Sequence, residues 1–118
     1  MLFFVNQTYS PTMSEIEIYV CVRQFWFGVA ASRRTRHESG RLPYPIAVGI
    51  ADGVVLRAYS IAEWLPGGDH IVDASAWRRE RRWEFVGQVL SGHPLVGRRL
   101  VNGDSEVMAT QQGYRYIN

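Results

Sequence analysis

Short runs of apolar residues, separated by glycine, proline and polar residues, divide the chain into segments typical of β-strands. Residues 46–51 and 54–64 flank Asp52-Gly53, a two-residue turn signal that predicts a β-hairpin. Both faces of 54–64 carry apolar side chains, which is typical of a covered sheet or a barrel. The predicted strands are Leu2–Asn6, which we expect to be central, Ile46–Ala51, Val54–Trp64, Arg81–Leu90 and Tyr114–Ile117.

The segment EIEIYVCVRQFWF, which follows Ser14, fits both a helix and a strand. Its apolar residues recur with helical spacing, but they also alternate, and its β-branched content favours a strand. Thr12 or Ser14 can cap a helix, and Glu15 and Glu17 then fall in the first turn, where acidic side chains are favourable. We therefore predict a helix, which Gly28 ends.

The remaining segments are polar or ambiguous. Residues 32–45 form an arginine-rich connection without a clear period, Asp69–Ala76 is a predicted loop, and Leu95–Val101 fits a short helix or a strand. Gly87 is expected to mark a β-bulge. The side chains expected to face the core nearby are Trp83, Phe85 and Val89. The pattern predicts a single α+β domain, residues 1–118, with a small curved, mainly antiparallel sheet or open β-barrel and one or two helices.

Composition narrows the class of protein. A chain of 118 residues with 47% apolar content is long enough to bury a core in one domain. The single cysteine, Cys21, excludes an internal disulfide and a cysteine-only zinc site. Apolar runs fall short of the ~20 residues that cross a bilayer, and the N-terminal run is too short for a signal peptide. We expect a cytoplasmic protein that does not bind membranes.

The charges are segregated along the chain, although the net charge is only +2. All 13 basic residues are arginine, a planar cation suited to phosphates, carboxylates and aromatic faces. Residues 23–41 and 77–99 each carry a local balance of +4, so the rest of the chain is acidic. Such segregation can create a positive face on a nearly neutral protein; the alternative is a set of solvated loops that never converge.

Tryptophans interleave with arginines in residues 77–83 (WRRERRW). Arginines contact phosphates and aromatic rings stack on bases, so this composition predicts binding of RNA or DNA, in single-stranded form or at a modified base. Alternatively, Trp83 is a core residue and the arginines pair with Glu80 and Glu84. The candidate nucleic-acid-binding residues are Arg33, Arg34, Arg36, Arg78, Arg79, Arg81, Arg82, Trp64, Trp77 and Trp83.

The residue types that carry most catalysis form no recognisable motif. Phosphate-binding loops, nucleophile elbows and zinc-ligand spacings are absent from the sequence. Asp69-His70 and Asp73 are metal-ligand types but lack a further ligand at a typical spacing, so we expect no metal or cofactor. An alternative function is a small enzyme that acts on a nucleotide-like anion, with acid–base groups drawn from His37, His70 and Glu84.

Five segments carry a family resemblance: FFVNQTYSPTMSE, IAVGIADGVVLRAYSIAEWLP, RRWEFVGQVL, LVGRRL and QQGYRYIN. They resemble a family of small uncharacterised bacterial and phage proteins with V-N-x-x-Y-x-x-x-M-S, G-V-V-x-x-Y-x-I-x-x-W, R-W-x-F-x-G and terminal R-Y-[IV]-N motifs. The middle segment also resembles sequences beside GIY-YIG-type nuclease domains. The chain departs from the family in residues 23–45 and lacks an N-P-I before its last motif.

The association with nuclease domains implies a role with nucleic acids. The strand-rich outline of the chain resembles PUA-like domains, including the ASCH and EVE groups, which are small barrels that often bind RNA or modified bases. Nuclease chemistry is not implied, because the chain has no GIY…YIG pair of its own. A further alternative is an interaction protein of a phage or defence system, whose positive face binds an acidic protein partner.

Overall fold

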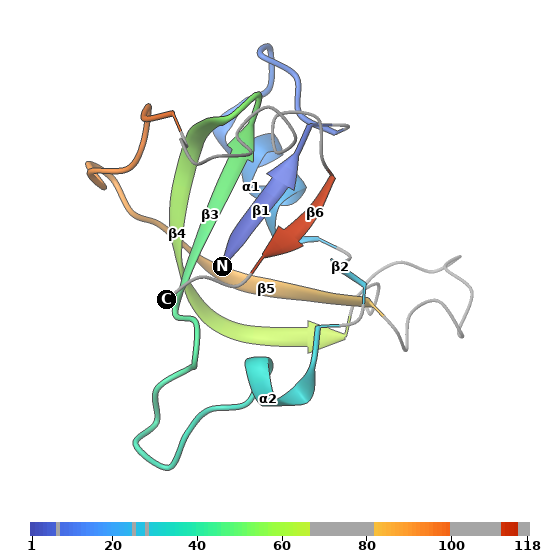
Figure 1. Ribbon diagram of the computed structural model, residues 1–118, viewed down its shortest axis with the longest axis vertical. Coiled ribbons are helices and arrows are strands. Elements are labelled where there is room, and N and C mark those ends of the chain that lie inside the picture. Colours follow the sequence, from blue (N-terminus) through green and yellow to red (C-terminus); the bar gives the residue numbers. More distant parts are fainter. Residues whose placement is uncertain (7, 25, 28, 67–81, 100–111, 116–118) are drawn as a thin grey trace.

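The structure, a computed structural model, describes residues 1–6, 8–24, 26–27, 29–66, 82–99 and 112–115. Within these residues the chain forms a six-stranded sheet and two helices (Figure 1). The strands are β1 (Leu2–Val5), β2 (Trp26–Phe27), β3 (Ile46–Ala51), β4 (Val54–Pro66), β5 (Arg82–Val89) and β6 (Gln112–Arg115), and the helices are α1 (Glu15–Arg23) and α2 (Ala31–Arg34). The α+β class is confirmed.

The strands lie in the order β2-β5-β4-β3-β1-β6. Among the described strands only β1 and β3 pair in parallel, so the sheet is mixed but mainly antiparallel, as predicted. β1 lies between β3 and β6 and all four of its residues are buried, which confirms it as an interior strand.

The sheet curls until the two edge strands approach each other. The rings of Trp26 on β2 and Tyr114 on β6 lie 6.2 Å apart, centroid to centroid. The ring of Phe3 on β1 packs between them and β5. It lies 5.0 Å from the Trp26 ring and 5.7 Å from the ring of Phe85 on β5, centroid to centroid. The described parts of β2 and β6 share no backbone pairing, so the sheet is curved but open.

Helix α1 covers the concave side of the curled sheet and lies behind β1 and β3 in Figure 1. Ser14 begins it with a capping box: its hydroxyl accepts from the Glu17 amide, and the Glu17 carboxylate accepts from the Ser14 amide. Val22 packs against β3 so closely that a Cβ at Gly49 would lie 2.5 Å from Val22 Cγ2. The helix prediction is confirmed, but the helix ends at Arg23 rather than near Gly28.

The Asp52-Gly53 hairpin is confirmed between β3 and β4. Both turn residues have positive φ, 50° at Asp52 and 72° at Gly53, as a two-residue turn of this kind requires. The register then shifts twice along β4, between Gly49 and Ile50 of the partner β3 and again between Ile61 and Glu63. The second shift lies beside Gly87, so the predicted bulge forms on β4 and not in β5 itself.

Some predictions need correction. Val89 lies opposite Tyr59 on the same face of the sheet, but it is not buried, because its side chain is 47% exposed at the end of β5. Residues 95–97 form turns rather than a helix or strand, and Arg99 makes an isolated bridge to Val54. The connection 32–45 contains the end of α2. Neither described helix has the length and apolar character needed to span a bilayer.

Candidate nucleic-acid interface

The short helix α2 brings the first arginine cluster against β5. Arg34 Nε donates a hydrogen bond to the Val29 carbonyl oxygen at 2.8 Å, which fixes the start of the side chain. Its guanidinium carbon then lies 3.4 Å from the centroid of the Trp83 ring. This is stacking distance, and the planar guanidinium is the basic group that can stack in this way. Residues 49 positions apart in the chain therefore form one surface element.

A second arginine–aromatic contact lies in the same segment. Arg33 Nη1 donates to the Tyr44 hydroxyl at 2.8 Å, and the guanidinium carbon lies 5.4 Å from the centroid of the Tyr44 ring. Tyr44 immediately precedes Pro45 and β3, so this contact ties α2 to the other end of the connection. The arginine-rich connection is thus held in place by its own cations.

Arg36 fastens the loop after α2 onto the sheet. Its guanidinium donates to the Gly40 carbonyl oxygen at 2.7 Å and also contacts the carbonyl oxygen of Ala62 at the β4 bulge. The loop closes through a 2.8 Å hydrogen bond from the His37 amide to the Arg41 carbonyl oxygen. Both groups that Arg36 binds are uncharged carbonyls, so these bonds leave its positive charge uncompensated.

We define the arginine surface as Arg33 and Arg34 of α2, Arg36 and Arg41 of the loop after it, and Arg82 at the start of β5. Figure 1 shows α2 beside the end of β4 and the start of β5. Arg82 is exposed and Trp83 is half-buried. A cavity of about 290 Å³ opens between Arg36 and Arg41, with Leu42, Pro45 and Ile61 as its apolar walls. Four predicted residues, Trp77, Arg78, Arg79 and Arg81, lie outside the described residues.

The second sequence cluster does not stay together. Arg98 donates to the Pro94 carbonyl oxygen at 2.9 Å, and Arg99 donates to the Asp52 carbonyl oxygen at 3.3 Å. The Val55 amide also donates to the Arg98 carbonyl oxygen at 2.9 Å, so both arginines lie beside the β3–β4 turn, at the opposite end of β4 from the arginine surface. Among the described arginines of the 77–99 cluster, Arg82 is therefore the one that lies near the residues of α2.

Trp64 is a core residue and not a surface stacking group. It is 7% exposed, and its ring lies 5.6 Å from Phe85 and 6.3 Å from Phe3. The register shift between Ile61 and Glu63 places Trp64 in the same core cluster as Tyr59 and Ile61, whereas strict alternation would turn it to the other face. Its place near the end of a strand is a weak signal of exposure, because β4 continues to Pro66 and β5 covers it.

The two candidate acid–base groups that the structure describes, His37 and Glu84, do not form a site. Glu84 is 1% exposed, and its Oε1 lies 3.6 Å from Arg23 Nη2, while His37 is exposed in the loop after α2. Sequence analysis missed the Arg23–Glu84 ion pair, since nothing local distinguishes a buried glutamate within a strand. His70 and the Asp69–Asp73 segment lie outside the described residues, and the described residues contain no group of three metal-ligand types.

No protein-family model, curated protein or solved structure matches this chain. The resemblance in sequence motifs and the PUA-like outline therefore stay predictions.

Proposed function

We propose that this protein is a nucleic-acid-binding module and that the arginine surface is its interface. The observation that carries the proposal is the stacking of Arg34 on Trp83 at 3.4 Å. This contact brings α2, which holds Arg33 and Arg34, against β5, which begins at Arg82. Cations from separate elements on one surface can follow a phosphate backbone, whereas scattered cations cannot. These five arginines belong to α2, the loop after it and the start of β5, and the acidic residues nearest to them in the sequence are Glu38, Glu80 and Glu84.

The arrangement of aromatic groups favours single-stranded RNA or DNA over a regular duplex. Unstacked bases bind to aromatic rings and to guanidinium planes, and here Arg34–Trp83 and Arg33–Tyr44 offer both. The guanidinium of Arg34 is already held by a hydrogen bond to Val29, and that of Arg33 by one to Tyr44. Binding therefore costs less side-chain conformational entropy. The curved, open sheet is also compatible with a PUA-like fold, which we include in the proposal.

The test is a fluorescence-anisotropy titration with short single- and double-stranded RNA and DNA at two salt concentrations. We expect single strands to bind more tightly, and the affinity to fall as salt rises because bound phosphates release counterions. The double variant R33Q/R41Q should weaken binding and lower the salt slope by about 0.7–0.9 for each lost phosphate contact.

The matched control is R98Q/R99Q, which removes the same charge from the β3–β4 turn. It should keep the wild-type salt slope, because these arginines lie away from the arginine surface. Equal losses in the two double variants would show that only net charge matters and would contradict the interface. Absence of binding by the wild type at low salt would exclude the function and direct attention to an acidic protein partner.

A further inference from the structure

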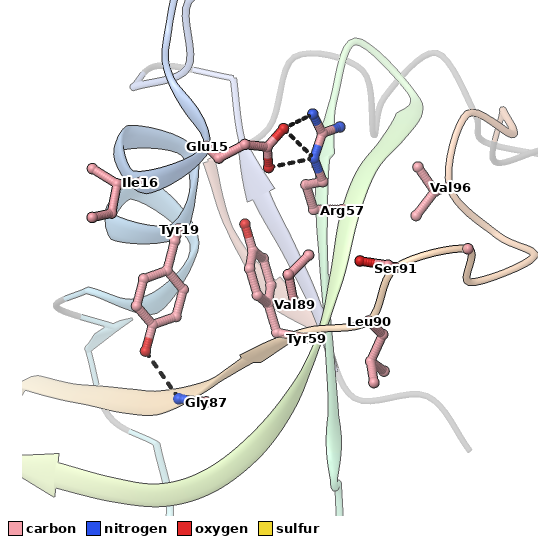
Figure 2. A pocket seen from close by; sticks show the side chains of 11 residues that line it. Glu15, Ile16, Tyr19, Arg57, Tyr59, Gly87, Val89, Leu90, Ser91 and Val96 are labelled. Atoms are coloured by element: carbon pink, nitrogen blue, oxygen red, sulfur yellow. Dashed lines mark hydrogen bonds and ion pairs between the residues drawn. The ribbon is translucent and has the colours of Figure 1, made fainter.

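A second concave site lies at the other end of β5, where it meets α1 and β4. The cavity has a volume of about 560 Å³, within the range of small-molecule sites. Trp83 and Val89 are six residues apart on one strand, so this site is about 20 Å from the arginine surface. We name it the tyrosine pocket. The lining residues used below are Ile16, Tyr19, Tyr59, Val89, Glu15 and Arg57 (Figure 2).

Two tyrosines form the inner wall of the tyrosine pocket. Their ring centroids lie 5.3 Å apart, and Tyr59 is 2% exposed. The Tyr19 hydroxyl accepts a hydrogen bond from the Gly87 amide at 2.9 Å, which holds this ring against β5 (Figure 2). The hydroxyl of Tyr59 is buried and has no hydrogen-bond partner among the described residues, an arrangement that requires an explanation in a native fold.

The rim of the pocket exposes large apolar side chains. Ile16 on α1 is 72% exposed and Val89 on β5 is 47% exposed, and both line the cavity. Single exposed apolar residues are common, but two that border one cavity form an apolar surface to which a ligand can bind. An apolar or aromatic body inserted there would be covered on both sides.

The polar end of the pocket carries one ion pair. Arg57 Nε donates to the two carboxylate oxygens of Glu15 at 2.9 and 3.1 Å, and Nη2 also contacts this carboxylate (Figure 2). Hydrogen bonding from Arg57 lowers the pKa of Glu15, and the carboxylate raises the pKa of Arg57. Both groups stay charged, so this end offers a donor and an acceptor with no net charge.

The backbone of β5 adds a second donor–acceptor pair. β2 pairs only with Arg82 and Trp83, so the outer edge of β5 continues beyond it without a described strand partner. The Phe85 carbonyl and the Gly87 amide on this edge bind Arg23 and Tyr19. The strand alternation turns the amide and carbonyl of Val89 to the same edge, next to the pocket.

We propose that the tyrosine pocket binds a small uncharged molecule that has an aromatic or apolar body and an amide group. The body would lie against Tyr19, Tyr59 and Val89, and the amide N–H and C=O would complement the Glu15–Arg57 pair or the Val89 edge. A ligand carboxylate would compete with Glu15 for Arg57, and a ligand cation would compete with Arg57 for Glu15. Either charge would leave one member of the pair uncompensated.

The experiment is an NMR titration of the ¹⁵N-labelled full chain with three probes of the same size: naphthalene-2-carboxamide, naphthalene-2-carboxylate and 2-naphthylmethylammonium. The carboxamide should shift the amide signals of Arg57, Gly87 and Val89, with a dissociation constant on the order of 1 mM for a ligand of this size. The two charged probes should bind at least about fivefold more weakly, because each breaks up the ion pair. Equal binding of all three probes, or shifts confined to other residues, would overturn the proposal.

A matched pair of variants on α1 tests the location. I16E places a charge at the rim of the pocket, whereas V20E places the same charge one turn further on, at a residue 39% exposed that does not line the cavity. I16E should weaken carboxamide binding by about fourfold for each buried CH₂ that is lost, and V20E should bind like the wild type. Spectra that match the wild type away from α1 establish that both variants fold. Equal effects of the two variants would contradict the site.

Discussion

At the residue scale, the chemistry of the candidate interface depends on arginine and not on positive charge alone. Arg34 reaches stacking distance of Trp83 while its Nε binds a backbone carbonyl, which a lysine ammonium on a flexible stem cannot reproduce. The same holds for Arg57, whose planar guanidinium contacts both carboxylate oxygens of Glu15. The all-arginine composition therefore has structural consequences in addition to its effect on net charge.

The buried hydroxyl of Tyr59 leads to a prediction about pH. Burial raises its pKa to about 12 from the ordinary value of 10. Above pH 10 the unfolded chain releases this proton while the folded protein keeps it, so the free energy of unfolding falls between pH 10 and 12. Y59F removes this contribution. Between pH 10 and 12 the free energy of unfolding, measured with urea, should therefore fall by about 1–2 kcal/mol less in the variant than in the wild type.

At neutral pH the same variant tests whether the hydroxyl is satisfied. With no hydrogen-bond partner among the described residues, its removal should leave the free energy of unfolding unchanged or raise it by up to about 1 kcal/mol. A loss of more than about 1 kcal/mol at pH 7 would mean that the hydroxyl makes a stabilising bond. Parallel curves for the wild type and Y59F above pH 10 would contradict the raised pKa.

At the scale of elements, the predictable features are those with a local cause. A cap at Thr12 or Ser14 with acidic residues in the first turn predicted a helix despite the β-branched residues that follow, and the structure forms the cap at Ser14 with Glu17. Asp52-Gly53 predicted the hairpin. The two-residue strand β2 had no such signal, because it exists only through its pairing with Arg82 and Trp83. Alternation correctly places Val89 on the same face as Tyr59, but it does not indicate that this end of β5 borders a cavity and stays exposed.

The pairing of β4 with β5 gives a second prediction. A Cβ at Gly87 would lie 2.0 Å from the Ser60 carbonyl oxygen and 3.0 Å from its carbonyl carbon. These are backbone atoms in the neighbouring strand, so the strands must move apart beside the β4 bulge. We expect G87A to lower the free energy of unfolding by about 3 kcal/mol, measured by urea denaturation.

The control for this variant is G92A, in the turn after β5. Gly92 has a φ of 74°, but a Cβ added there would have no neighbouring atom within 4 Å, so only backbone strain of about 1–2 kcal/mol is expected. In hydrogen exchange, G87A should also reduce the protection of the Ser60 and Ile61 amides, and G92A should not. An effect of G87A no larger than that of G92A would show that the sheet absorbs the methyl group.

At the scale of the whole molecule, sequence clusters and surface clusters differ. The segregation of arginines predicted a positive face, but folding joins Arg34 to Trp83 and carries Arg98 and Arg99 to the other end of β4. Trp64, near the end of a predicted strand, belongs to the core. Composition indicates the chemistry of the candidate interface. Which residues form it depends on strand register and on the path of the connection after α2.

Arg78 and Arg79, predicted from the sequence to contact phosphates, lie outside the described residues, four and three positions before Arg82 in the sequence. Their part in the proposed interface can be tested by substitution. We expect R78Q/R79Q to weaken binding to all nucleic-acid sequences and to lower the salt slope by about 0.7–0.9 for each lost phosphate contact. Anisotropy titrations at several salt concentrations measure this slope.

Combining this change with R33Q/R41Q distinguishes one interface from two. If a single strand follows both groups of arginines, the quadruple variant should lose the sum of the two slope changes, because each phosphate contact releases its own counterions. If the groups hold different strands, each double variant should instead reduce the number of strands bound at saturation. A wild-type slope in R78Q/R79Q would restrict the interface to the arginine surface, with Arg34 stacked on Trp83 at its centre.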